Sequence, residues 1–111
     1  MTPYALLLRL SGLSQREAAA FHDVRPDTVK SWSGGRNRAP GGAMDELREL
    51  IARQELSAEA DLAKLRKLTA EHGHPDILSL TFQNGDWPCE SAAGMALARV
   101  IAKIRHPVEI E

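Results

Sequence analysis

The fold of this chain is decided by residues 14–32, which read SQREAAAFHDVRPDTVKSW. Ser14 and Glu17 fit the capping box, in which a serine and a glutamate three residues later bond the free N–H groups at a helix start. Pro26 suits the first position of another helix, because the N–H group that proline lacks has no partner there. The stretch therefore predicts two short helices joined by a tight turn near Asp23.

Capping signals on either side of this stretch predict two further helices. A helix can begin at Thr2, which is followed by a proline, and end at Gly12. Another is expected from about Ala43 to Gly73, because leucines recur along it at helical spacing. Ser57 could cap a new helix, so we expect a kink or a short break there.

The apolar spacing changes in the C-terminal third of the chain. Residues 77–82 mix apolar and polar side chains as a strand does, and the turn signal at 84–86 allows a return strand beginning at Trp87. Residues from Ser91 onward are helical again, and residues 108–111 alternate like a short terminal strand. The expected fold class is mainly α with a small C-terminal α+β part.

Composition is ordinary for a folded globular chain. Hydrophobic residues make up 43% and charged residues 26% of 111 residues, which allows one compact domain or one small domain with an appendage. No apolar run approaches the roughly 20 residues that a membrane span needs. The single cysteine excludes an intrachain disulfide and a multi-cysteine zinc site. We therefore expect a cytoplasmic protein that holds no metal and needs no cofactor.

Charge is distributed unevenly along the chain. The first 42 residues carry 6 basic and 3 acidic groups, or +3, so the rest of the chain carries 8 basic and 12 acidic groups, or -4. A basic segment favours a polyanionic partner, because phosphates that it binds release their condensed counterions. On charge alone, a polyanionic partner and a chance distribution both stay open.

Residues 11–32 resemble the helix-turn-helix of the XRE (Cro/C1-repressor-like) family. In that family a glutamine opens the second helix, and a small residue, a turn residue, a β-branched residue and a large apolar residue follow at set spacings. Those places are held here by Gln15, Ala19, Asp23, Val29 and Trp32. The resemblance covers about residues 3–55, and a looser one extends to the anti-CRISPR-associated repressors and their bacterial relatives. Two residues depart from the family pattern, since Asp23 replaces the usual glycine and His22 replaces an apolar residue.

The resemblance implies that the third helix enters the major groove of DNA. Burial of Val29 and Trp32 would leave one side of that helix to contact bases, with Arg25, Pro26, Asp27, Thr28, Lys30 and Ser31. The start of the second helix and the loop after the third would contact phosphates, with Ser14, Gln15, Arg16, Arg36, Asn37 and Arg38. For Asp27 the favoured alternative is a cap on helical N–H groups, and Lys30 could contact a phosphate instead of a base.

The expected organisation is an N-terminal helix-turn-helix bundle of four to five helices, residues 1–56, and a C-terminal dimerisation region, residues 57–111. A single recognition helix offers few base contacts, so two copies would read half-sites about 34 Å apart. Apolar residues of the C-terminal region exceed what so small a tail could bury alone. Those expected at the dimer interface are Ile77, Leu80, Phe82, Trp87, Met95, Ile101 and Ile104.

The function expected from these observations is a sequence-specific transcriptional regulator, a repressor that binds a palindromic operator in double-stranded DNA as a homodimer. Two alternatives stay open. One is an antitoxin that neutralises a toxin and autoregulates its operon, and the other is a protein-interaction adaptor that does not bind DNA. An enzyme is not expected, because the sequence shows no set of residues in a recognisable catalytic pattern.

Overall fold

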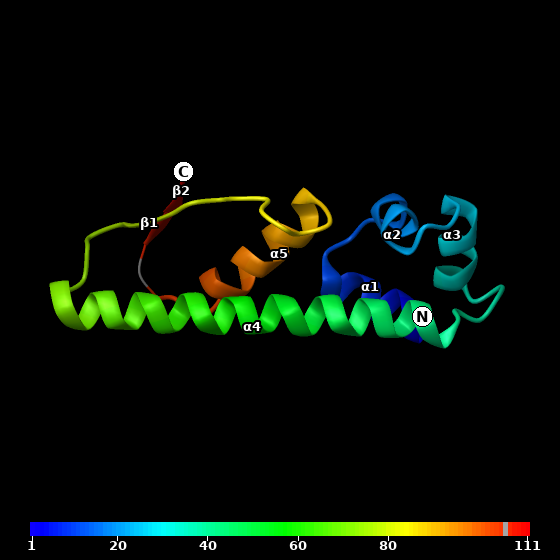
Figure 1. Cartoon of the computed structure of the whole chain (residues 1–111), viewed down its shortest axis with the longest axis horizontal. Coiled ribbons are helices and arrows are strands. Elements are labelled where there is room, and N and C mark those ends of the chain that lie inside the picture. The colour runs from blue at the N-terminus through cyan, green and yellow to red at the C-terminus, as the bar shows by residue number, and fades with distance from the viewer. Residues whose placement is uncertain (106) are drawn as a thin grey trace.

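The computed structural model describes residues 1–105 and 107–111, and it confirms a mainly helical fold with one small pair of strands (Figure 1). The elements in chain order are α1 (Pro3–Ser11), α2 (Gln15–His22), α3 (Pro26–Gly34), α4 (Gly41–His72), β1 (Leu78–Leu80), α5 (Glu90–Ile101) and β2 (Val108–Ile110).

Local signals set the limits of the first three helices as the sequence predicts. Thr2 caps α1 with its side chain, and Pro26 is the first residue of α3. The capping box of α2 is complete: the Ser14 N–H donates to Glu17 Oε1 at 2.9 Å, and the Glu17 N–H donates to Ser14 Oγ at 3.1 Å. Asp23 ends α2 with φ of 58°, the left-handed conformation that aspartate tolerates better than most residues.

The first three helices and the beginning of α4 enclose the main hydrophobic core. Val29 and Leu47 lie at its centre and are fully buried. Burial of one such aliphatic side chain contributes about 1.5–3 kcal/mol. Ala92 belongs to the same core, so α5 is attached to the N-terminal helices. The buried members are Tyr4, Leu8, Leu13, Ala18, Ala19, Val29, Trp32, Ala43, Leu47, Leu50 and Ala92.

Helix α4 runs through 32 residues without interruption, so the kink or break expected at Ser57 is absent. The reason is that Ala58 and Leu62 continue the buried face of the helix and pack against α5 and its C-terminal extension. Packing along this face outweighs the capping preference of one serine. The helix ends at Gly73 as predicted, and it begins at Gly41, slightly earlier than expected.

A second, smaller core forms on the distal half of α4. Ala58, Leu62 and Val100 are buried there, and Leu65, Leu80 and Ile104 pack against them. The terminal strand expected over residues 108–111 is confirmed as β2, which pairs with β1 in parallel. Parallel strands need a long crossover connection, and here the chain makes it through α5.

The return strand expected at Trp87 is wrong. The Trp87 N–H donates to the Asn84 carbonyl at 3.1 Å, which closes a turn, and the chain then enters α5. The strand expected over residues 77–82 shortens to β1 for the same reason, because no antiparallel neighbour extends it.

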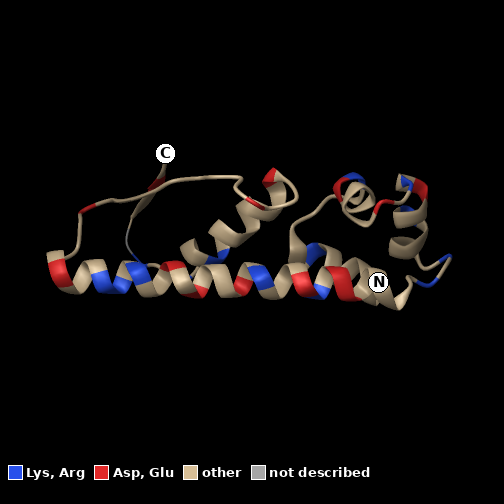
Figure 2. Ribbon diagram, in the orientation of Figure 1, with Lys and Arg blue, Asp and Glu red and all other residues tan. Residues whose placement is uncertain are grey.

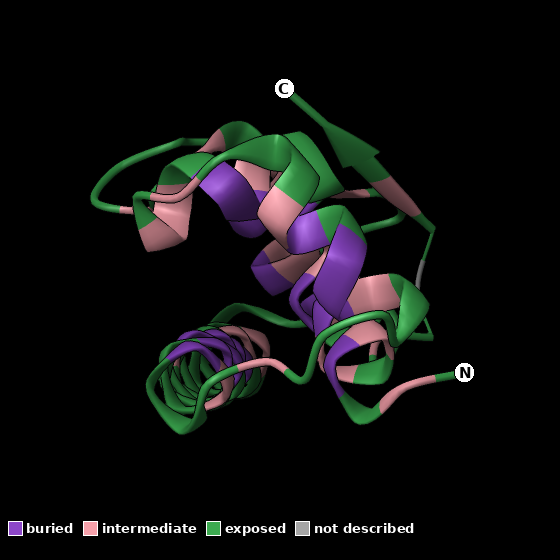
Figure 3. Cartoon of the chain, turned by 90° about the vertical axis from the view of Figure 1, so that its right-hand side faces the viewer, coloured by how far each residue is buried: buried purple, intermediate pink, exposed green. Residues whose placement is uncertain are grey.

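The molecule is elongated, with extents of 53 × 23 × 21 Å and a radius of gyration of 16.5 Å. A compact chain of this length would have a radius of gyration of about 13 Å. Figure 1 shows α4 along the whole length, with α1 to α3 at one end and the strands at the other. In the view along α4, its buried side faces the remaining helices (Figure 3). The boundary between residues 1–56 and 57–111 therefore falls inside a helix that both parts share.

Candidate nucleic-acid interface

The two sides of α3 differ in what they contact. Val29 is fully buried and Trp32 is only 8% exposed, so their predicted inward orientation is confirmed. The Trp32 ring lies edge-on to Tyr4, with 5.5 Å between the ring centroids. Thr28 is half-buried at the margin of the exposed side. The exposed side presents Arg25, Pro26, Asp27 and Lys30.

Ser31 is not part of this exposed side, so the prediction that it protrudes beside Arg25 is wrong. The loop after α3 folds back over Ser31, which is 9% exposed. Asn37 Nδ2 donates to Ser31 Oγ at 2.8 Å, and the N–H of Arg36 donates to the Ser31 carbonyl at 3.1 Å. A pocket of about 440 Å³ remains at this place, lined by Asp27, Lys30, Ser31 and Arg36.

The cap expected from Asp27 is also wrong. The residue that precedes α3 is Arg25, and no side chain makes a capping hydrogen bond at this helix start. The Asp27 carboxylate is exposed on the same side as Lys30. It is therefore free to accept a hydrogen bond from outside the molecule.

Five exposed cationic side chains lie on α2, on α3 and in the residues that flank α3, and none has an acidic partner within the described ranges. They are Arg16, Arg25, Lys30, Arg36 and Arg38. Figure 2 shows basic segments on α2, on α3 and on the loop before α4, all at one end of the molecule. An exposed cation without a carboxylate partner keeps its full charge available for a phosphate.

The family resemblance implies that the start of α2 contacts phosphates, and Arg16 is exposed at this helix start. Ser14 and Gln15 are both exposed there. The Ser14 oxygen is used in the capping box, but its hydroxyl proton remains available for donation. Asn37 differs from the expected phosphate contact, because its amide nitrogen is engaged by Ser31 and holds the loop in place.

A partly buried polar chain of Tyr4, His22 and Glu46 was not predicted. The His22 side chain is 1% exposed, its Nδ1 lies 3.3 Å from Glu46 Oε1, and its Nε2 lies 3.0 Å from Tyr4 Oη. The imidazole also packs edge-on against Trp32, with 5.8 Å between centroids. Burial, with the nearby Glu46 carboxylate, raises the pKa of Tyr4 to about 12. The partners come from α1 and α4, so spacing around His22 could not reveal them.

Six of the seven residues expected at the dimer interface are at least half-buried in their own chain, and only Ile77 is exposed, at 54%. Leu80 and Ile104 pack on the second core, and Trp87 packs on the main core with the Arg53 guanidinium 4.3 Å from its ring centroid. The other three are Phe82, Met95 and Ile101. The long α4 supplies apolar surface that the tail was expected to lack, and the dimer interface stays a prediction.

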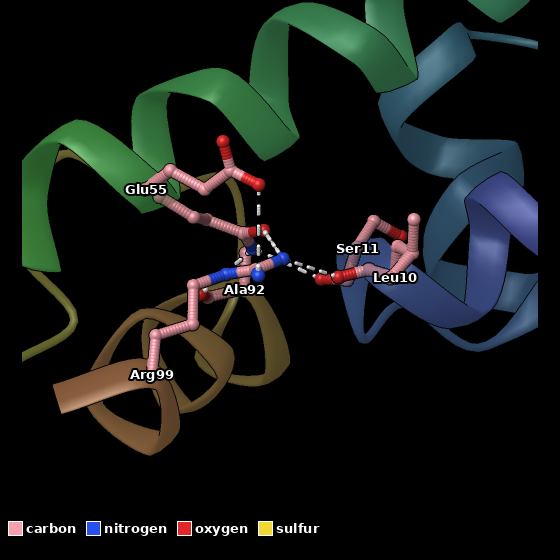
Figure 4. A network of polar contacts seen from close by, with 6 residues as sticks. Leu10, Ser11, Glu55, Ala92 and Arg99 are labelled. Atoms are coloured by element: carbon pink, nitrogen blue, oxygen red, sulfur yellow. Dashed lines mark hydrogen bonds and ion pairs between the residues drawn. The ribbon is translucent and has the colours of Figure 1, made fainter. Parts of the chain in front are cut away.

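A buried polar network joins α1, α4 and α5 (Figure 4). Gln54 is fully buried, and its Nε2 donates to the carbonyls of Ser11 at 2.9 Å and Ala92 at 3.1 Å. Arg99 donates to the Leu10 carbonyl at 2.8 Å and to Gln54 Oε1 at 3.4 Å. Carbonyls at a helix end lack hydrogen-bond donors within the helix. Gln54 on α4 and Arg99 on α5 supply the donors for the last carbonyls of α1.

Comparison with known proteins assigns the chain to no family, since no family model and no curated protein matches it. In the part of the chain that the structure describes, no three His, Cys, Asp or Glu side chains gather in a way that could hold a metal ion. Likewise, no described helix combines the length and the apolar character needed to cross a bilayer.

Proposed function

We propose that this chain is a sequence-specific DNA-binding transcriptional regulator of the XRE type, a repressor that binds a palindromic operator as a homodimer. The observation that carries the proposal is the two-sided α3. Val29 and Trp32 are buried on its inner side, Arg25 and Lys30 are exposed on its outer side, and neither cation has an acidic partner among the described residues. An α-helix fits the width of the major groove, where each base pair shows a distinct pattern of donors and acceptors.

Base recognition is assigned to the first turn of α3. Arg25 can donate two hydrogen bonds to guanine O6 and N7, and the exposed Asp27 carboxylate can accept from cytosine N4. Lys30 lies one turn further along the same side. Pro26 has no N–H group to donate, so it can only contact a thymine methyl group or fix the backbone. Ser31 is left out of base recognition, because the loop after α3 covers it.

Phosphate binding is assigned to the cations that flank α3. Arg16 lies on α2, and Arg36 and Arg38 lie on the loop that Asn37 ties to Ser31. Contacts to phosphates fix the register of a protein on DNA and carry no sequence information by themselves. The two groups of residues therefore make different experimental predictions.

The DNA-binding proposal is tested by selecting duplexes from a random pool and then measuring variants on the recovered site. Arg25→Ala is expected to lose about 1–3 kcal/mol of binding free energy and to relax preference at one base pair. Arg36→Ala and Arg38→Ala are expected to weaken binding to all duplexes and to lower the salt slope by about 1 each. Lys67→Ala, an exposed cation near the far end of α4, is the matched control. Absence of binding to every duplex, or four variants that behave alike, would refute the assignment.

The homodimer is tested on the same samples. A palindromic site is expected, with half-site centres about one helical turn apart. Sedimentation equilibrium at micromolar concentration is expected to give twice the chain mass of 12.2 kDa. A monomer that binds a single half-site would contradict the dimer and leave the role of α3 intact.

A further inference from the structure

A hollow of about 420 Å³ lies between the distal half of α4, β1 and the segment that follows α5. Its floor is apolar and is formed by Leu62, Leu65, Leu78 and Ile104. Leu62 is buried in the second core, and the other three are half-buried, so the floor is a fixed part of the structure. The volume falls in the range of small-ligand sites, about 300–1,000 Å³.

The rim of this hollow is basic. Arg66, Lys103 and Arg105 line it, and His74 is a further basic lining residue. The side chains of the first three are exposed and make no hydrogen bond or ion pair within the described ranges, and no carboxylate is among the described lining residues. The concentration of positive charge is local, because residues 43–111 as a whole carry 8 basic and 12 acidic groups.

We propose that this hollow binds a small amphiphilic anion, in which a carboxylate or phosphate headgroup is carried on an apolar body. The guanidinium groups of Arg66 and Arg105 present planar pairs of donors that suit an oxyanion, and Lys103 adds a third charge. The leucine and isoleucine floor suits the apolar body, because burial of apolar surface contributes binding free energy. A ligand made of phosphate groups alone would bury no apolar surface there. The small volume, with an apolar floor next to a basic rim, favours a small molecule over a protein or a membrane surface.

The site is independent of the proposed DNA interface. It lies at the strand end of α4, whereas α3 lies at the other end of the same helix (Figure 1). No residue of the hollow belongs to the exposed side of α3 or to its flanking loops. The two proposals can therefore fail separately.

Calorimetric titration of the full chain at low salt tests the ligand class. Octanoate and naphthalene-2-carboxylate are the probes, and 1-octanol and inorganic phosphate represent the apolar body and the headgroup alone. The two carboxylates are expected to bind saturably with one site per chain, at least about tenfold more tightly than either control, and more weakly as salt rises. Amide NMR shifts are expected to cluster at residues 62–70, 78 and 103–105. Absence of saturable binding, or shifts confined to other segments, would overturn the proposal.

Matched variants separate the rim and the floor from nonspecific effects. Arg66→Gln is expected to weaken octanoate binding about fivefold to tenfold, whereas Lys67→Gln, the exposed neighbour that does not line the hollow, is expected to leave it unchanged. Ala70→Trp places a large ring in the hollow and is expected to abolish octanoate binding. Ala63→Trp, on exposed α4 surface outside the hollow, is expected to leave binding unchanged. Circular dichroism reports whether each variant is folded.

Equal losses in each variant and its control would overturn the proposal. Dissociation of a dimer by octanoate, without binding to the monomer, would overturn it as well and would assign the hollow to a second copy of the chain.

Discussion

A single side chain can change the role of its neighbour, as Asn37 does for Ser31. The sequence places Ser31 on the exposed side of α3, and helical periodicity alone supports that placement. The amide of Asn37 bonds the Ser31 hydroxyl at 2.8 Å and brings the loop over it. Arg36 and Arg38, on either side of Asn37, are held close to α3 in consequence. Ser31 thus supports the loop that we propose to bind phosphates.

Tyr4 makes a pH-dependent contribution to stability that can be measured directly, because it is the single tyrosine of the chain. Its pKa in the folded state, about 12, lies above the ordinary value of 10.0. The stabilisation is therefore complete below pH 10 and is lost as pH rises through 12, with a change of up to about 2 kcal/mol. Absorbance titration of the phenol is expected to show the raised midpoint.

The control for this prediction is Tyr4→Phe. It removes the hydrogen bond to His22, so its stability at neutral pH is expected to be lower by about 1 kcal/mol. Its urea midpoint should then depend less on pH between 10 and 12 than that of the unmodified chain. A phenol that titrates near its ordinary pKa would contradict the burial of Tyr4 near the Glu46 carboxylate.

At the scale of single elements, the helix limits that follow from neighbouring residues were predictable, and those that depend on distant packing were not. Ser14 and Glu17 form the expected capping box, and Asp23 takes the expected left-handed turn. Ser57 offers the same kind of capping signal in a place where Ala58 is buried against the second core. The capping signal is local, whereas the apolar surface that overrides it comes from α5 and β1, which follow much later in the chain.

Substitution of Ser57 distinguishes a continuous α4 from two capped helices. In a continuous helix, Ser57→Ala is expected to leave stability unchanged or to raise it by up to about 0.5 kcal/mol, because alanine is the better helix former. A helix start at Ser57 would instead lose about 1 kcal/mol on the same change. Urea denaturation measures the difference, and Ser57→Pro serves as the disruptive comparison with an expected loss of about 3 kcal/mol or more.

Across the whole molecule, the least predictable features are contacts between segments far apart in the chain. The exposed side of α3, which we propose to face the bases, follows from the XRE-like spacing, apart from Ser31. The chain of Tyr4, His22 and Glu46 joins three helices, and no spacing rule connects its members. The parallel pairing of β1 with β2 was missed as well, since the turn signal after β1 favours an antiparallel neighbour.

The polar network around Gln54 is expected to hold α1 and α5 together. Gln54→Leu keeps the volume but leaves the Ser11 carbonyl and the Arg99 guanidinium without their buried partner, so stability is expected to fall by about 2 kcal/mol. Gln83→Leu, an exposed site in the segment before α5, is the control. Hydrogen exchange should show faster opening of α5 in the first variant only. Equal stability of the two variants would show that the network is dispensable.

Because α4 forms one wall of both cores, neither core has a boundary of its own along this helix. Residues 56–57 lie inside this helix, so they offer a protease no exposed linker. A cut there would divide α4 and leave each fragment with only part of the helix that covers its core. Heating is therefore expected to unfold the chain in one cooperative transition. A fragment that ends at residue 56 would expose apolar surface where α5 packs in the full chain, and that surface would need polar substitutions before the fragment could fold by itself.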